Sequence, residues 1–78
     1  MNDIMKKVSD ESYLIKMFDD FRLGYINKFE VYPSALKLIK DKRITLKRVK
    51  QIAWMTCKIP SNVVDDRIQY MQILENQL

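Results

Sequence analysis

Histidine is absent from this 78-residue sequence, and cysteine occurs only once, at Cys57. The missing histidine removes the usual general base, the commonest zinc ligand and every Ser-His or Cys-His catalytic pair. A single cysteine excludes an internal disulfide bond and is typical of a reducing, cytoplasmic compartment. We therefore expect a protein that is not an enzyme and holds no metal and no cofactor. Cys57 is expected to pack as a small hydrophobic side chain near a helix end.

Glycine and proline are also scarce, with one glycine and two prolines in the whole chain. One glycine cannot build a phosphate-binding glycine loop, and all-β folds need many more turn residues. No segment approaches the length of a membrane-spanning helix, and the N-terminal MNDIMKKVSDES lacks the apolar core of a signal peptide. These absences favour a soluble, cytoplasmic, all-α protein that binds neither a membrane nor a small-molecule substrate.

The residues that are present are typical of one small globular domain over residues 1–78. Hydrophobic residues make up 47% of the chain and charged residues 31%, which separates it from disordered proteins. A domain of this length has a thin core, so a partner or a second copy is a natural source of further stability. We predict a compact bundle of four short helices.

Helix signals divide the N-terminal half of the chain into two helices. Ser9 is a good N-cap, so the first helix is predicted over residues 10–22, with Gly24 ending it. The stretch YINKFEVYP fits either a helix or a short extended piece. Because a residue before proline is biased away from helix, we predict that the second helix begins at Pro33 or Ser34.

The C-terminal half is predicted to form a helix over 45–57, capped by Thr45, and a helix over 61–77, capped by Ser61. Helical spacing assigns the first of these helices a buried stripe of Leu46, Val49, Ile52, Ala53 and Thr56. It assigns the second a buried stripe of Val63, Val64, Ile68, Met71, Leu74 and Leu78. The large apolar residues that fall off these stripes are Trp54, Met55 and Ile73.

The segment LKRVKQIAWMTCKIPSNVVDDRIQYM spans these two helices and the turn between them. It places Ile52 and Ala53 where the first helix packs tightly, IPS after the turn, and Val64 with Ile68 on the second helix. In these positions the segment, about a third of the chain, resembles the helix-turn-helix unit of DNA-binding domains. The resemblance implies that the second helix reads the major groove and that the protein regulates transcription.

The turn and the start of the second helix differ from the usual helix-turn-helix pattern. Cys57 and Lys58 occupy the region where these families usually have glycine, and the connection is one residue longer. Asp65 and Asp66 lie at early positions of the second helix, where carboxylates suit the helix dipole but repel phosphates.

Positive charge is concentrated in the middle of the chain. Residues 37–58 carry eight basic side chains and one acidic one, a net charge of +7, between segments of net charge −1 and −2. The candidate binding residues in this segment are Lys37, Lys40, Lys42, Arg43, Lys47, Arg48, Lys50, Gln51, Trp54 and Lys58. Basic side chains neutralise phosphates and Trp54 can stack on an unpaired base, so we predict a regulator that binds nucleic acid, with DNA as the expected form.

The same residues support other interpretations. Tryptophan and arginine are enriched at protein-binding hot spots, so Trp54, Met55 and Arg48 also fit an inhibitor or adaptor that binds an acidic protein surface. A homodimer through Ile73 and its apolar neighbours is a further possibility. The alternative without a binding role is a solvated basic face, with Trp54 packed onto a neighbouring helix. The exposure of the Trp54 indole distinguishes these interpretations.

Overall fold

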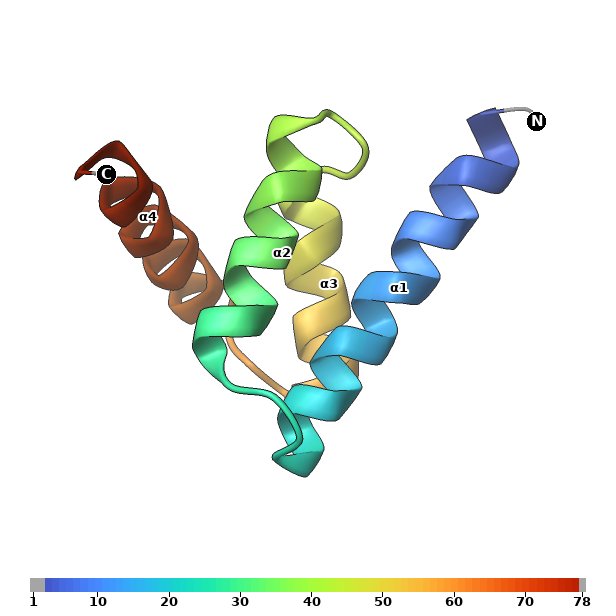
Figure 1. The fold of residues 1–78 in the computed structure, drawn as a ribbon. Helices are drawn as coiled ribbons and strands as arrows, with labels where there is room; N and C mark the ends of the chain where they lie inside the picture. The colour runs from blue at the N-terminus through green and yellow to red at the C-terminus, as the bar shows by residue number, and fades with distance from the viewer. Residues whose placement is uncertain (1–2, 78) are drawn as a thin grey trace.

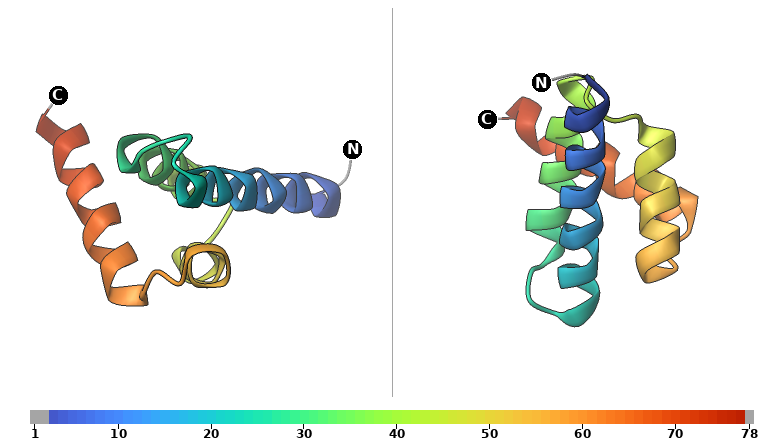
Figure 2. Two further views of the ribbon diagram at one scale, coloured as in Figure 1. Left: turned by 90° about the horizontal axis from the view of Figure 1, so that it is seen from below. Right: turned by 90° about the vertical axis from the view of Figure 1, so that its right-hand side faces the viewer.

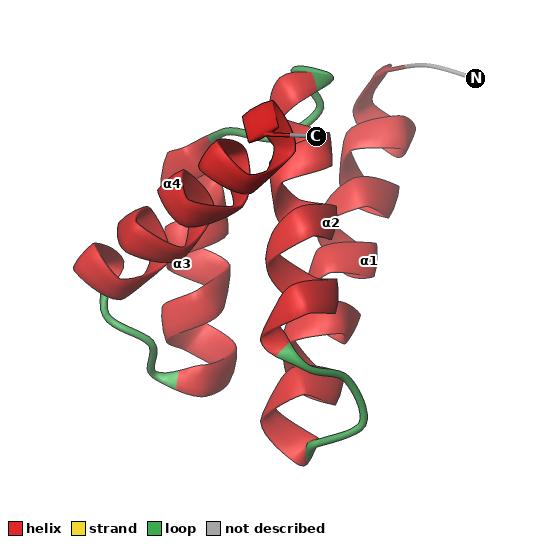
Figure 3. Cartoon of the chain, turned by 60° about the vertical axis from the view of Figure 1, so that its left-hand side comes forward, coloured by secondary structure: helices red, strands yellow, loops and turns green. Residues whose placement is uncertain are grey.

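The computed structural model describes the backbone of residues 3–77 and the side chains of residues 9–77. Within this range the chain forms four α-helices and no strand, so the predicted all-α bundle is confirmed (Figure 3). The helices are α1 (Asp3–Leu23), α2 (Lys28–Lys40), α3 (Leu46–Cys57) and α4 (Ser61–Gln77). Their lengths and apolar content do not allow any helix of this described part to cross a membrane.

The helices pack so that α2 and α3 lie between α1 and α4 (Figure 1). α1 and α3 run in the same direction, and α2 runs opposite to both. When α3 is viewed nearly end-on, α4 lies crosswise to it (Figure 2, left). α3 lies on one side of the molecule and α1 with α2 on the other, and the turn into α4 and the start of α4 lie beside α3 (Figure 2, right).

The core is built from apolar stripes of all four helices. The predicted stripe of α3 is confirmed at Val49, Ile52 and Ala53, which are fully buried, and Leu46 packs against them partly exposed. In α4 the residues Val64, Ile68 and Met71 are buried, Val63 and Leu74 are half-buried, and Leu78 lies outside the described residues. The remaining buried apolar residues are Leu14, Phe18, Val31, Tyr32, Ala35, Leu36, Leu38 and Ile44.

The start of α1 differs from the prediction. The helix begins at Asp3 instead of residue 10, so Ser9 lies in its interior and the predicted N-cap is wrong. No glycine or proline interrupts residues 3–9, and Asp10 is engaged by a tertiary ion pair rather than by a helix terminus. The predicted stop at Gly24 is confirmed. Its φ of +85° is in the left-handed region, and the N–H of Tyr25 reaches back to the Asp20 carbonyl at 2.9 Å.

The start of α2 also differs from the prediction. The helix begins at Lys28, and the side-chain oxygen of Asn27 accepts a hydrogen bond from the N–H of Phe29 at 2.8 Å. Asn27 is therefore an N-cap that supplies one of the acceptors missing at a helix start. The ambiguous stretch YINKFEVYP is a helix from its fourth residue onward.

Pro33 lies inside α2 and does not define its start, contrary to the prediction. A proline in a helix interior costs about 3 kcal/mol, while burying one large apolar side chain contributes about 1.5–3 kcal/mol. The first turns of α2 bury both Val31 and Tyr32, and the Tyr32 ring packs edge-on against Phe18 at a centroid distance of 6.0 Å. Two such burials outweigh one proline. Burial of Tyr32 also raises the pKa of its hydroxyl.

The turns on either side of α3 use lysine where glycine is usual. Lys42 and Lys58 have φ values of 59° and 58°, in the left-handed region that costs most residues about 1–2 kcal/mol. The predicted N-cap Thr45 is confirmed, because its hydroxyl accepts from the Arg48 N–H at 3.1 Å. The predicted cap Ser61 is wrong by one residue, since α4 begins at Ser61 itself.

Candidate binding surface on α3

The eight basic residues of segment 37–58 fall into two sets in the folded chain. One set forms ion pairs with acidic residues of α1 and α4: Lys40–Glu75, Arg43–Asp10, Arg48–Glu11 and Lys50–Asp65. The other set has no ion pair with any residue whose side chain is described: Lys37, Lys42, Lys47 and Lys58. The charge that is separated along the sequence is therefore partly cancelled in space.

The ion pairs with α1 are the more buried of these contacts. Arg43 binds Asp10 with two parallel hydrogen bonds, from Nε at 2.9 Å and from Nη2 at 2.6 Å, and Asp10 is only 6% exposed. Arg48 donates from Nε to Glu11 at 3.0 Å and from Nη1 to the side-chain oxygen of Gln51 at 3.0 Å. Both guanidinium groups are thus committed to the contact between α1 and the segment around α3.

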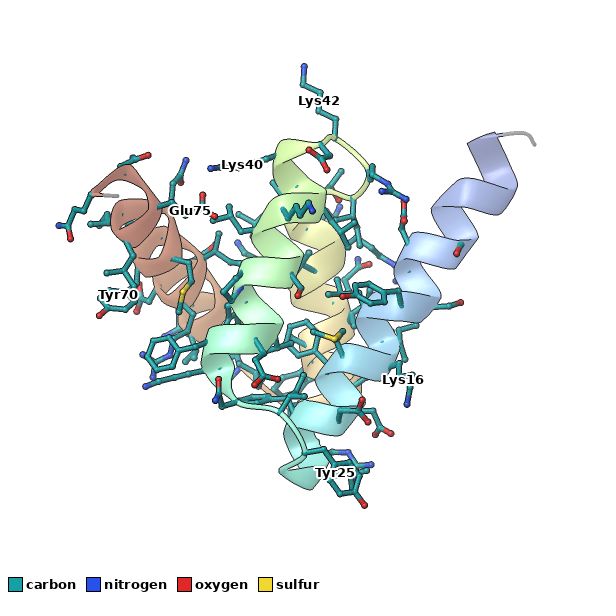
Figure 4. All side chains as sticks on the ribbon, in the orientation of Figure 1. Lys16, Tyr25, Lys40, Lys42, Tyr70 and Glu75 are labelled. Carbon is teal, nitrogen blue, oxygen red and sulfur yellow. The ribbon has the colours of Figure 1, made fainter. Side chains whose placement is uncertain are left out.

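The ion pairs with α4 lie nearer to solvent. Lys50 of α3 contacts Asp65 at 2.7 Å. Lys40 and Glu75 point toward one another between the ends of α2 and α4, whereas Lys42 points away from the body (Figure 4). Exposed pairs of this kind contribute little stability, about 0–1 kcal/mol each, but they neutralise the two lysines locally.

The exposed face of α3 brings together the predicted residues that remain available. Lys47, Gln51, Trp54 and Lys58 follow one another at steps of four, three and four residues, the spacing of one helix face. Met55 lies beside them, and the four helical residues share an arc of about 100° at 100° per residue, while Lys58 is the left-handed cap just after the helix. We call these five residues the outer stripe of α3.

The outer stripe is apolar in its centre and basic at its ends. Trp54 is 52% exposed and Met55 is 53% exposed, so the Trp54 indole is not buried in the core, although about half of it is covered by the fold. The left-handed turn at Lys58 carries its ammonium group to 5.6 Å from the centre of the indole ring. This distance allows a cation–π contact, which orders the Trp54 side chain without burying it.

The two flanks of the outer stripe are the ion pairs just described. Arg48 and Glu11 lie on the side of α1, and Lys50 and Asp65 lie on the side of α4. The ion pairs neutralise the charge on both flanks. The outer stripe between them keeps two lysines, Lys47 and Lys58, that have no ion pair with a described side chain. Of the ten predicted binding residues, the structure brings Lys47, Gln51, Trp54 and Lys58 into this strip. Lys37, Lys40, Lys42 and Arg43 lie elsewhere, in α2 and the loop after it.

The residues that sequence reasoning missed are the four carboxylates in these ion pairs. Two lie at least 33 positions away from their arginine partners in the sequence, and no local pattern links them. The net charges of the segments indicate these ion pairs only weakly, because the basic segment lies between two acidic segments. Met55, which the sequence suggests as a protein-binding residue, belongs to the outer stripe.

A cavity of about 450 Å³ lies between α1 and α2, away from the outer stripe. Its charged lining residues are Asp10, Lys37, Asp41 and Arg43, so two carboxylates face two cations. Cys57 is half-buried and donates its thiol hydrogen to the Phe18 carbonyl at 3.2 Å. Among the described side chains, no group of three metal-ligating residues is placed to hold a metal ion.

The predicted helix-turn-helix pair corresponds to α3 and α4. Lys58 in the turn adopts the left-handed conformation that glycine favours, which a lysine reaches only at some energetic cost. At the start of α4 Asn62, Asp66 and Gln69 are exposed, whereas Asp65 pairs with Lys50. No protein-family model matches the sequence, and comparison with curated proteins and with solved structures found no match.

Proposed function

We propose that this protein is a non-enzymatic inhibitor or adaptor that binds another protein through the outer stripe of α3. The observation that carries the proposal is the half-exposed indole of Trp54, the only tryptophan in the chain. A small domain with a thin core gains from burying its largest side chain. Here that side chain, with the neighbouring Met55, lies on the face opposite the core of α3.

Binding of a partner would bury apolar area that folding leaves in water. A tryptophan side chain buries about 150–250 Å², so the exposed half of Trp54 amounts to about 100 Å² and about 2.5 kcal/mol of hydrophobic free energy. This is the size of effect found at protein-binding hot spots, which are rich in tryptophan. Lys47 and Lys58 border the apolar centre and suit acidic groups at the rim of an interface.

The charge spacing favours a protein over a nucleic acid as the partner. Lys47 and Lys58 are eleven residues apart, about 16 Å along a helix. Over that length one strand of duplex DNA carries about five phosphates, at about 3.4 Å each along the axis. Two lysines without a described ion-pair partner would meet five negative charges, and the ion pairs on the flanks add no net positive charge.

Nucleic acid is the second candidate, and one observation favours it. An exposed tryptophan with a lysine over its ring and a second lysine on the same helix face is an arrangement that stacks unpaired bases. The helix-turn-helix resemblance of α3 and α4 supports the same proposal. Under it, binding would be sensitive to salt and would extend to DNA of any sequence at low salt.

The substitution Trp54→Ala tests the proposed function. It should abolish co-purification of one specific cellular protein and leave the four-helix fold intact, because only about half of the indole is buried. Tyr70→Ala is a matched control, since Tyr70 is 48% exposed on α4 and should retain the partner. Loss of an oligonucleotide complex on Trp54→Ala, with no protein captured, would instead support the nucleic-acid candidate.

A further inference from the structure

We infer that the partner presents an acidic amphipathic helix, which lies along the outer stripe of α3 with a carboxylate near each of its ends. The inference rests on the proposed function and narrows the partner to one class of protein segment. It is carried by the spacing of the two available lysines, by the apolar residues between them and by the ion pairs on both flanks.

The shape of the outer stripe matches a second helix. Lys47 lies in the first turn of α3 and Lys58 is the cap residue just after its last turn, so the backbone between them spans about 16 Å. Packed helices lie about 8–10 Å apart, so a partner helix of the same length can place its own apolar stripe over Trp54 and Met55. Carboxylates eleven residues apart on that helix would then face the two lysines.

The flanks restrict where an acidic helix can lie. Glu11 is hydrogen-bonded to Arg48 on one side, and Asp65 contacts Lys50 on the other. Each flank holds a carboxylate beside its cation and has no net charge, so it offers an acidic group no attraction. The two lysines of the outer stripe have no such partner among the described side chains, which favours alignment of an acidic helix along α3.

A second copy of this chain is a poorer occupant. The exposed face of α4 has the same spacing as the outer stripe, with Asp66, Tyr70, Ile73 and Gln77 at steps of four, three and four residues. This face offers one carboxylate and a neutral glutamine at the position of the second. It would match only one of the two lysines, whereas an acidic helix matches both.

Two designed peptides test the inference, with the single tryptophan as the reporter. Both are tryptophan-free helices of about 18 residues with leucine and methionine on one face. One carries glutamate at two positions eleven residues apart, and the other carries lysine at the same positions. The acidic peptide should shift Trp54 emission to the blue, protect it from acrylamide and bind at least tenfold more tightly than the basic peptide.

Charge reversal gives the decisive variant and its control. Lys47→Glu with Lys58→Glu should invert the preference, so that the basic peptide binds more tightly. Lys37→Glu with Lys42→Glu changes the net charge by the same amount at two lysines outside the outer stripe that have no ion pair with a described side chain, and should keep the preference for the acidic peptide. Circular dichroism of both double variants verifies that the four helices are retained.

Several results would overturn the inference. They are equal affinity for the two peptides, no change in Trp54 emission at millimolar acidic peptide, or inversion by the control pair. Tighter binding of oligothymidine than of the acidic peptide would assign the outer stripe to nucleic acid. A blue shift that depends on protein concentration alone would assign it to a second copy. If Trp54→Ala still abolishes capture of a cellular protein, the proposed function stands and only the acidic helix is excluded.

Discussion

Arg48 and Lys50 on the flanks of α3 lie only one and three residues from Lys47 on its outer stripe, yet they have different roles. Arg48 and Lys50 are held in ion pairs by α1 and α4, whereas Lys47 and Lys58 have no ion pair with any described side chain. One residue along a helix turns the side chain by about 100°, which is enough to move it from a helix–helix contact into solvent. A local excess of basic residues is therefore a poor measure of an exposed basic surface.

The largest expected effect is on the free energy of unfolding, and it distinguishes the buried face of α3 from its exposed face. Ile52→Ala removes a fully buried side chain and should lower the free energy of unfolding by about 2–5 kcal/mol. Trp54→Ala removes a side chain of which only about half is buried, about 100 Å², and should lower it by at most about 2.5 kcal/mol. Urea unfolding of the two variants checks the contrast. A loss of several kcal/mol for Trp54→Ala would show that the indole is structural and would contradict its assignment to a binding surface.

A smaller effect is expected at the two left-handed lysines. Lys42→Gly and Lys58→Gly should each stabilise the fold by up to about 1 kcal/mol, because glycine adopts a positive φ without strain. The greater chain entropy of glycine when unfolded opposes part of this gain. Only Lys58→Gly should weaken partner binding, since only Lys58 belongs to the outer stripe. Thermal unfolding measures the first effect and affinity measures the second; equal affinities for both variants would remove Lys58 from the binding surface.

The smallest effect on stability is expected from removing the carboxylates that neutralise the flanks. Asp65→Asn and Glu75→Gln leave Lys50 and Lys40 without anionic partners, at a cost of about 0–1 kcal/mol for each of these pairs near solvent. The double variant should bind oligothymidine more tightly. Two additional phosphate contacts would steepen the salt dependence of log K by about 1.4, at about 0.7 per contact for a single strand. An unchanged slope would show that these pairs do not mask a nucleic-acid surface.

Much of the fold is predictable from the sequence, because the relevant signals are local. The spacing of Val49, Ile52 and Ala53 identifies the buried face of α3, and Thr45 and Gly24 act as the expected cap and stop. The prediction fails at Ser9 and Pro33, where a local helix-start signal is outweighed by an uninterrupted helix or by the burial of Val31 and Tyr32. In both cases the missing information is which neighbouring helix the residues contact.

The sequence by itself determined the number and type of the elements, the apolar faces of α3 and α4, and the position of Trp54 outside the core stripe. Periodicity fixes these features, since a helix repeats every 3.6 residues whatever surrounds it.

Only the tertiary structure decided which basic residues remain available. That choice depends on carboxylates more than 30 residues away for both arginines, which reach them only when α1 packs beside α3. The binding surface is therefore not the basic segment as a whole. It is the strip of α3 that the ion pairs leave uncovered, with Trp54 at its centre.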